Sequence, residues 1–97
     1  MYSISIKDLL NELNLSKTNI IDIRSPFQYQ LDHIPTAINI SYQALRNNPE
    51  KYLEKNKKYY IYCQSGHSSN NLVIILNQLG YTTVNIIGGY NNYLLMK

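Results

Sequence analysis

Cys63 is the only cysteine among the 97 residues and has the most reactive side chain of this sequence. It ends the β-prone run KYYIYC and opens the polar segment CQSGHSS, residues 63–69. A free thiol with a pKa of about 8.5 is only about 3% ionised at pH 7, so it needs its surroundings to become a nucleophile. Gly66 is free to adopt backbone angles that turn several N–H groups inward, just before a predicted helix N-terminus. The segment is therefore predicted to be an anion cradle that favours a thiolate.

The same cysteine has a second interpretation that involves no chemistry. A lone cysteine in an intracellular protein is commonly a small apolar side chain that fills space at the end of a strand. Cys63 viewed alone fits that role too, so its context in the chain must decide between a nucleophile and a filler.

Strands and helices alternate along the chain that carries this segment. β-branched and aromatic runs predict strands at 19–23, 37–40, 58–63 and 82–89. Apolar spacing and capping residues predict helices at 6–14, from Pro26, and at 42–48, 49–56, 68–79 and 90–97. This alternation predicts an α/β fold with a mainly parallel sheet and helices on both faces. Reactive groups collect at the carboxyl ends of such strands, where Cys63 lies.

Three local signals mark helix ends. Ser5 precedes Asp8 by three residues, the spacing of a capping box. Ser25 is placed as an N-cap before Pro26, which suits the first helical position. Gly80 stands where a left-handed residue would end the helix before it.

Composition limits the class of protein. With 44% hydrophobic and 15% charged side chains, residues 1–97 are expected to form one globular domain. A single cysteine allows no internal disulfide and supplies at most one metal ligand, so we expect neither a metal site nor a cofactor. No apolar run approaches the ~20 residues of a membrane helix, and the N-terminus lacks the pattern of a signal peptide. We therefore expect a cytoplasmic protein that does not bind membranes.

The net charge of +3 is mild and comes mainly from the segment KYLEKNKK, residues 51–58. Its four lysines are mixed with Glu54 and the preceding Glu50, which is typical of a solvated face, with a patch for an acidic partner as the alternative. The sequence has no zinc-finger spacing, basic helix or aromatic RNA-binding motif, so no nucleic acid partner is expected.

Three motifs in the right order resemble the rhodanese-like domains over nearly the whole chain. The strand, the Cys-x-x-Gly-x-x-Ser loop and the following helix are similar to the active-site segment of that family. The downstream segment LGYTTVNIIGGYNNY resembles the family's Leu-Gly-aromatic, Val, Gly-Gly ending, with Tyr93 where tryptophan is usual. Upstream, the family's Asp-x-Arg, aromatic and His-Ile-Pro-x-Ala-x-Asn signature is matched by Asp22, Arg24, Tyr29, His33, Ile34, Pro35, Ala37 and Asn39.

The resemblance implies a five-stranded parallel sheet flanked by helices and a sulfurtransferase activity. In that chemistry a cysteine thiolate takes sulfane sulfur from thiosulfate or a persulfide and passes it to cyanide or a thiol. Cys63 would be the nucleophile, and the thiolate and persulfide would be stabilised by amides of Gln64, Ser65, Gly66, His67, Ser68 and Ser69. Because the chain has no second thiol, the acceptor must come from outside, as a small thiol or a thioredoxin-like or other carrier protein.

The sequence departs from the family within the loop itself. The family often has an arginine at the position of Ser68, and its loss removes a contact worth about 1.5–3 kcal/mol to a dianion such as thiosulfate. We therefore expect thiosulfate to be used roughly ten- to a hundredfold less well, and persulfide donors to be affected less. His67 either supplies part of the missing charge or is a loop histidine that faces solvent.

Further departures lie in the upstream motif. Gln28 replaces a usual glutamate, which changes an expected ion pair with Arg24 into a neutral hydrogen bond. Asp32 and Thr36 replace usual glycines, and Asp32 is predicted to lie in a turn that tolerates a left-handed conformation. His33 is expected to hold the loop that leads into the third strand.

Asp22 and Arg24 follow a buried strand and are expected to orient the neighbouring loop, with two ordinary surface charges as the alternative. Phosphatases of the same fold have a loop one residue longer that ends in a phosphate-binding arginine. Ser69 occupies that position, and no arginine follows Arg46, so the sequence argues against this activity. The remaining alternative to an enzyme is a persulfide carrier or sulfide-sensing module that depends on a partner.

Overall fold

The computed structural model describes residues 2–12 and 14–97, and five strands form one sheet in the order β1-β5-β4-β2-β3. Every neighbouring pair of strands is parallel. This arrangement confirms the predicted α/β class. The strands are β1 (Ser3–Ile4), β2 (Asn19–Asp22), β3 (Ile38–Asn39), β4 (Lys58–Tyr62) and β5 (Thr82–Ile86).

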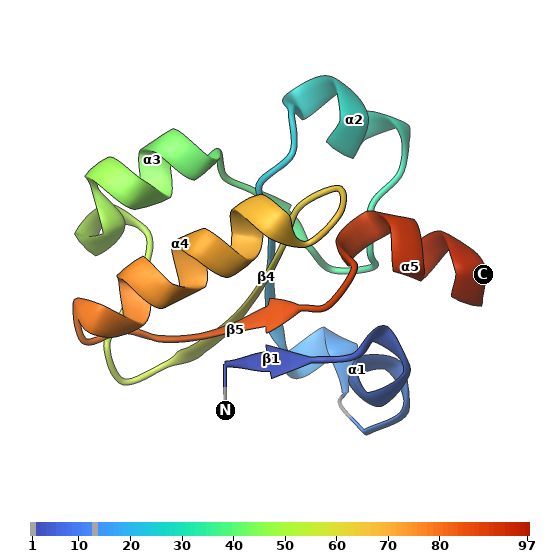
Figure 1. Cartoon of the computed structure of the whole chain (residues 1–97), viewed down its shortest axis with the longest axis horizontal. Coiled ribbons are helices and arrows are strands. Elements are labelled where there is room, and N and C mark those ends of the chain that lie inside the picture. Colours follow the sequence, from blue (N-terminus) through green and yellow to red (C-terminus); the bar gives the residue numbers. More distant parts are fainter. Residues whose placement is uncertain (1, 13) are drawn as a thin grey trace.

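Helices cover both faces of the sheet, as predicted. Figure 1 shows α3 and α4 on one side of the strands and α1 and α5 on the other. Over residues 2–12 and 14–97, no helix has the length and apolar character needed to cross a membrane. The α-helices are α1 (Ile6–Glu12), α2 (Pro26–Leu31), α3 (Tyr42–Asn47), α4 (His67–Gln78) and α5 (Gly89–Met96), with 3-10 turns at η1 (Leu15–Lys17) and η2 (Pro49–Lys51).

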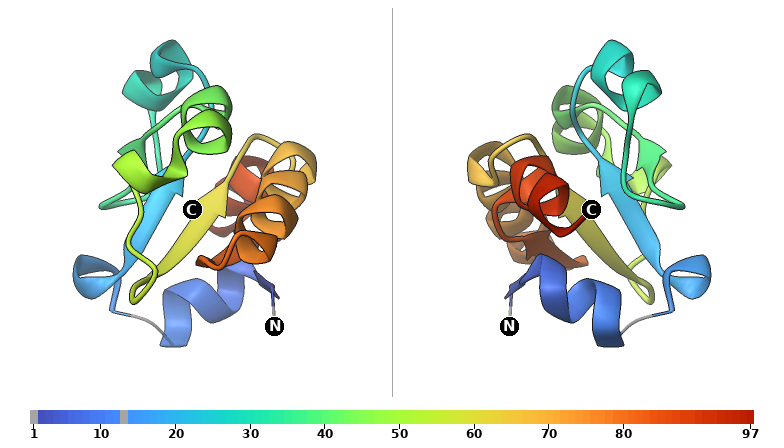
Figure 2. Two further views of the ribbon diagram at one scale, coloured as in Figure 1. Left: turned by 90° about the vertical axis from the view of Figure 1, so that its left-hand side faces the viewer. Right: turned by 90° about the vertical axis from the view of Figure 1, so that its right-hand side faces the viewer.

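The sheet separates two hydrophobic cores. The side views of Figure 2 show the helices that lie on either side of the strands. Tyr60 and Tyr62 of β4 point into the core closed by α1 and α5. Tyr59 and Ile61 of the same strand point into the core closed by α3 and α4. Because side chains alternate along a strand and both faces are covered, β4 has no polar face. Cys63 continues this alternation and joins the second core.

The helix-end signals in the sequence are confirmed. The Ser25 hydroxyl accepts a hydrogen bond from Gln28 N, and the Gln28 side-chain oxygen accepts one from Ser25 N, which completes a capping box. The Ser5 hydroxyl accepts from Asp8 N at 3.1 Å. Gly80 has φ +98°, the left-handed conformation expected at the end of α4. The helix predicted at 6–14 is present as α1, and its predicted position Leu13 lies outside the described residues.

Two features differ from the prediction made from the chain itself. The helix expected at 49–56 is only the turn η2, because the amide of Glu54 binds the Tyr59 hydroxyl at 2.8 Å instead of continuing a helix. Strand β1 has two residues, and no apolar run in the sequence predicts it. It exists because its backbone pairs with the free edge of β5, where Ile87 N donates to Ile4 O at 2.9 Å.

Candidate active site

Cys63 follows β4 at the carboxyl edge of the sheet, and the loop from Cys63 to Gly66 leads directly into α4. Gly66 has φ +98°, so the backbone angle predicted from its glycine is confirmed. A Cβ atom at this position would lie 2.9 Å from the backbone nitrogen of Gly88. Both the angle and the close approach require glycine here.

Two amides and a hydroxyl group converge on the Cys63 sulfur. Sγ accepts hydrogen bonds from Gly66 N at 3.1 Å and Ser69 N at 3.4 Å, and the Ser69 hydroxyl oxygen lies 3.3 Å away. Cys63 is only 7% exposed, and Ser69 is fully buried. The loop is therefore an anion cradle of two amides and a hydroxyl, which is the arrangement that the sequence predicts around Cys63.

Burial and these donors act on the thiol in opposite directions. Burial raises the pKa of the Cys63 thiol because a thiolate is poorly solvated in the protein interior. Hydrogen bonds from the side chain and amide of Ser69 and from the amides of Gly66 and Ser65 more than offset this effect. The net pKa of Cys63 is lowered, so the folded loop raises its thiolate fraction.

The start of α5 holds the loop in this orientation. Tyr90 N donates to Cys63 O at 2.9 Å, and Asn91 N donates to Gln64 O at 3.0 Å. With these carbonyls bound on the outside, the loop amides point inward toward the sulfur. A Cβ on Gly89 would lie 2.2 Å from Cys63 O, so the Gly-Gly segment lets α5 approach closely.

The six loop residues named from the sequence have different places. Gly66 and Ser69 contact the sulfur, and Ser65 contributes through its backbone. The Gln64 side chain points away and donates to Asn91 Oδ1 at 2.6 Å. His67 and Ser68 are exposed, and neither side chain has a hydrogen-bond partner among the described residues. The solvent-facing interpretation of His67 therefore fits the structure.

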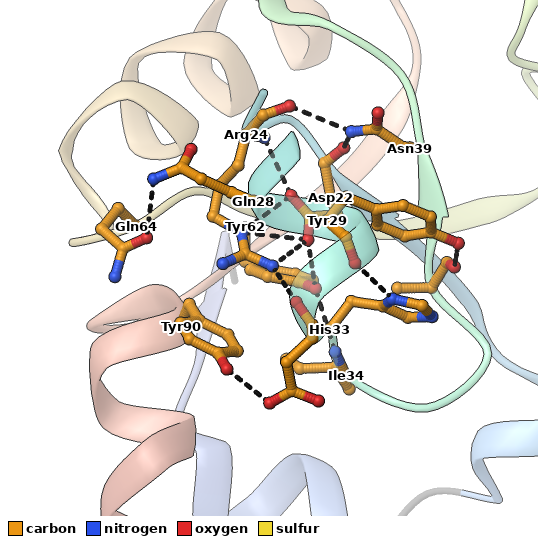
Figure 3. Close-up of polar contacts among 12 residues, drawn as sticks. Asp22, Arg24, Gln28, Tyr29, His33, Ile34, Asn39, Tyr62, Gln64 and Tyr90 are labelled. Atoms are coloured by element: carbon orange, nitrogen blue, oxygen red, sulfur yellow. Dashed lines mark hydrogen bonds and ion pairs between the residues drawn. The ribbon is translucent and has the colours of Figure 1, made fainter. Parts of the chain in front are cut away.

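Asp22 and Arg24 form a buried ion pair, so the alternative of two surface charges is wrong. Arg24 Nη2 lies 2.7 Å from Asp22 Oδ2, and the two residues are 7% and 0% exposed. The Tyr62 hydroxyl donates to the same carboxylate at 2.6 Å, and Arg24 Nη2 also donates to Asp32 O at 2.6 Å (Figure 3). Burial raises the pKa of Tyr62, and its bond to Asp22 raises it further, so Tyr62 remains a donor.

Arg24 reaches the cysteine loop through Tyr90 rather than by touching the sulfur. Its guanidinium carbon lies 4.0 Å from the centroid of the Tyr90 ring, and Figure 3 shows the two groups side by side. The backbone of Tyr90 in turn holds the Cys63 carbonyl. The geometry supports the predicted role of Asp22 and Arg24 in orienting the loop, with α5 as the intermediary.

The upstream substitutions behave differently from the prediction. Gln28 completes the cap of α2 and lies 3.4 Å from Gln64 Oε1, and within the described chain it makes no hydrogen bond to Arg24. Asp32 has φ −173°, so its predicted left-handed conformation is wrong. Its backbone is extended at the end of α2, where its carbonyl binds Arg24. The left-handed residue is Thr36, with φ +72°.

His33 has the structural role expected for it. Its ring stacks on Tyr29 with centroids 3.9 Å apart, and Nδ1 lies 2.8 Å from Tyr29 O. The Tyr29 hydroxyl is bonded to Ala37 O at 2.5 Å. These contacts tie α2 to the segment that leads into β3.

Two hollows flank the loop. One of about 220 Å³ is lined by Arg24, Gln28, Leu31, Asp32, Gln64 and Tyr90. The other, of about 290 Å³, is lined by Ser65, Gly66, His67, Asn70, Asn71, Asn85, Ile87 and Gly88. Loop residues line both hollows, and Cys63 is not among the lining residues of either.

Sequence reasoning did not single out Asn85 or Tyr90 as site residues. Asn85 is a buried amide in β5 whose Oδ1 receives a hydrogen bond from Ser69 at 2.5 Å. A lone asparagine in the apolar run VNII was a signal that could have identified it. The contact between Tyr90 and the loop has no such signal, because it depends on the backbone amide.

Two curated relatives are similar to most of the chain. The thiosulfate sulfurtransferase PspE of Escherichia coli (strain K12) is 35% identical over 78 residues, which cover 79% of this chain and 75% of that protein. The thiosulfate sulfurtransferase GlpE of Coxiella burnetii (strain RSA 331 / Henzerling II) is 32% identical over 75 residues, covering 76% of this chain and 69% of that protein.

Solved structures and a family model agree with these relatives. A rhodanese-related protein from Thermoplasma volcanium has 33% identity and a TM-score of 0.86, covering 99% of this chain and 93% of its own. The human single-domain sulfurtransferase TSTD1 has the same fold, with a TM-score of 0.85 at 22% identity, covering 100% and 98% of the two chains. A family model described as the rhodanese-like domain matches residues 5–95. The chain therefore belongs to the rhodanese-like domain family.

Proposed function

We propose that this protein is a sulfurtransferase that carries sulfane sulfur as a persulfide on Cys63. The observation that carries the proposal is the cradle around Sγ, where two amides and the Ser69 hydroxyl converge on one buried sulfur. A cysteine that merely fills space needs none of these donors. The names of the PspE and GlpE relatives support the same class of reaction.

The proposed cycle has two displacement steps. In the first, the Cys63 thiolate attacks the outer sulfur of the donor, a new S–S bond forms, and the donor's S–S bond breaks. With thiosulfate the products are the Cys63 persulfide anion and sulfite, so sulfur and charge balance. In the second, cyanide or an external thiolate attacks the outer sulfur and leaves as thiocyanate or a new persulfide, which restores the Cys63 thiolate.

The loop has further backbone amides that could donate hydrogen bonds to the outer sulfur of a persulfide. The first amides of a helix have no intrahelical acceptor, and the amides of His67 and Ser68 occupy that place in α4. These amides would stabilise negative charge on the outer sulfur while Gly66 and Ser69 hold the inner one. This division of donors is the electrostatic contribution of the loop to catalysis.

The donor preference follows from which charges surround the loop. Ser68 is exposed, and the nearby guanidinium of Arg24 is already bound to Asp22. Thiosulfate would therefore be held by neutral donors alone, and a persulfide on a small thiol or protein is the better donor. A persulfide carrier that serves a partner protein is the second candidate, since the same lack of a cation favours it.

Mass spectrometry of the intact protein tests the proposal. After exposure to a persulfide or thiosulfate, Cys63 is expected to gain one sulfur atom, which cyanide or a thiol then removes. Cys63→Ser is the control, since it is expected to keep the fold and cannot form a persulfide. An unmodified Cys63 after exposure to both donors would refute the proposal. Loading without release to cyanide or small thiols would favour the partner-dependent carrier.

A further inference from the structure

The Ser69 hydroxyl lies among three acceptors. Its oxygen is 2.5 Å from Asn85 Oδ1, 3.3 Å from Gly66 O and 3.3 Å from Cys63 Sγ. Ser69 is fully buried and Asn85 is 5% exposed, so bulk water does not compete for these contacts. A hydroxyl has one proton and therefore donates to only one of the three at a time.

The Asn85 amide has a defined orientation. Its Nδ2 faces the Gly66 carbonyl at 3.5 Å, and a carbonyl only accepts hydrogen bonds. Oδ1 is therefore the atom that faces Ser69, and it too only accepts. Of the three acceptors, Asn85 is closest to the hydroxyl.

The charge on the sulfur decides where the proton is best placed. A neutral thiol can donate its own proton to Ser69 Oγ, and Ser69 then donates to Asn85, which makes a continuous chain of hydrogen bonds. A thiolate only accepts, so it needs the Ser69 proton for itself, and Asn85 then loses its donor. Asn85 and the thiolate thus compete for one proton.

We infer that Asn85 is a positioning residue: its Oδ1 accepts the hydrogen bond of the Ser69 hydroxyl whenever Sγ is uncharged, and the hydroxyl turns to donate to Sγ when the sulfur is a thiolate. The inference rests on the proposed function in one respect: when Sγ gains an outer sulfur, its charge moves outward and the hydroxyl turns back to Asn85. Asn85 thereby stabilises the sulfur-loaded state of Cys63 relative to the thiolate. Before sulfur is loaded, it also limits the fraction of Cys63 that is ionised.

The hydrogen bond from the Ser69 hydroxyl is a main influence on the ionisation of the Cys63 thiol, because no charged side chain is bonded to the sulfur among the described residues. The hydrophobic cluster that contains Cys63 joins residues of β2, β4, α3 and α4. Among the described residues, none of the titratable groups on these elements and the adjoining segments hydrogen-bonds to Sγ; these groups are Asp22, Arg24, Tyr42, Arg46, Lys58, Tyr59, Tyr60, Tyr62, His67 and Tyr81.

The test measures Cys63 alkylation by iodoacetamide as a function of pH, without any sulfur donor. Asn85→Val removes the competing acceptor, and valine is a residue that is favoured in β-strands. Its Cys63 pKa is expected to fall, with a thiolate fraction about three- to tenfold higher well below the pKa. Ser69→Ala removes the donor and is expected to raise the pKa. In the Ser69→Ala background, Asn85→Val is expected to change nothing further.

A matched control lies on the same strand and face. Thr83 of β5 is 1% exposed, and its hydroxyl donates to Val73 O at 3.3 Å, away from the sulfur. Thr83→Val is expected to leave the pKa of Cys63 unchanged. If Asn85→Val does not yield folded protein, Asn85→Leu makes the same test with a larger apolar side chain.

The sign of the shift decides the matter. If Asn85 merely braces the loop, its loss weakens the amide donors and the pKa of Cys63 rises. A rise or no change in Asn85→Val, or a fall that persists in the Ser69→Ala background, overturns the inference. Because no donor is present, the result does not depend on sulfur transfer, which the mass-spectrometric experiment tests separately.

Discussion

The neighbouring strands β2 and β4 each lead into a buried ionisable group, the Asp22 carboxyl group and the Cys63 thiol, and the surroundings of the two groups differ. The Asp22 carboxylate receives a full countercharge from Arg24 at 2.7 Å and a hydrogen bond from Tyr62. The Cys63 sulfur receives two amides and a hydroxyl and contacts no cation among the described residues. A carboxylate neutralised in this way is a structural element, whereas neutral donors stabilise a thiolate and leave it able to react.

The two sites are also coupled in one direction. The ring of Tyr90 stacks against Arg24, and its backbone amide holds the carbonyl of Cys63. The Asp22–Arg24 ion pair therefore supports the cradle through α5, but its charged groups do not contact the sulfur. Changes at the ion pair should act first on folding, and changes in the loop should act first on chemistry.

The largest effect on folding is expected from Asp22→Asn. The variant leaves the guanidinium of Arg24 buried without its counterion, and the free energy of unfolding should fall by about 3–5 kcal/mol. Urea denaturation measures this change. Glu54→Gln, which breaks an exposed pair with Lys57, should change the free energy of unfolding much less than Asp22→Asn does.

A milder variant tests the same site if the Asp22→Asn protein does not fold. Tyr62→Phe removes one hydrogen bond to the Asp22 carboxylate and should cost about 1–3 kcal/mol while the ion pair stays intact. An Asp22→Asn protein as stable as the parent would show that Arg24 finds another partner or reaches solvent.

Gly66→Val should break the chemistry more than the fold. Valine disfavours φ +98°, and its Cβ would approach Gly88 N to 2.9 Å, so the Gly66 amide would turn away from the sulfur. Sulfur loading of Cys63 should slow by about a hundredfold, because oxyanion-type donors each contribute that much. Mass spectrometry of samples quenched at a series of times measures the loading rate.

Gly80→Ala is the matched control for this variant. Gly80 has the same φ of +98°, but a Cβ there meets the flexible side chain of Lys55 at 3.4 Å, far along α4 from the loop. It should lower stability by about 1 kcal/mol and leave sulfur loading unchanged. Equal loading rates for Gly66→Val and the parent would remove the loop amides from the mechanism.

Ser68→Arg adds to the cysteine loop the fixed charge that distinguishes the other site. Thiosulfate turnover should increase by up to about a hundredfold, while turnover of an uncharged persulfide donor stays within a few fold. Added salt should depress the gain, because an exposed charge is screened over a Debye length of about 10 Å at 0.1 M. Ser68→Gln adds a longer polar side chain without a charge and should show no gain. Unchanged thiosulfate turnover in Ser68→Arg would mean that charge does not limit this donor.

Periodicity and capping residues predicted most of the fold. The strands β2, β4 and β5 are long enough to show apolar runs, and Ser25, Pro26 and Gly80 act locally, so their effects are readable from neighbours in sequence. Strand β1 has two residues and owes its existence to β5, which lies about eighty residues away in the chain. A contact of that kind leaves no local pattern.

The candidate site divides in the same way. Cys63 and Gly66 could be identified because one thiol and one glycine at that spacing indicate a cradle. The burial of Asp22 and Arg24 could not, since two charges after a strand are compatible with solvent until Tyr62 and Tyr90 are seen to cover them. Asp32 and Thr36 both replace glycines that are usual in the family, and only the folded backbone shows which of the two is left-handed.

That position is Thr36, and it offers the smallest of these effects, outside both sites. A β-branched residue at φ +72° is strained, and the Thr36 hydroxyl donates to Leu15 O at 3.0 Å, which offsets part of the cost. Thr36→Gly and Thr36→Ala both remove the hydroxyl, but only alanine keeps a Cβ in the left-handed region. The glycine variant should therefore be about 1 kcal/mol more stable than the alanine variant in urea, with the same m-value. Both should load sulfur at the parent rate, because Thr36 contacts neither the ion pair nor the cradle. An alanine variant at least as stable as the glycine variant would show that the strain at Thr36 is negligible.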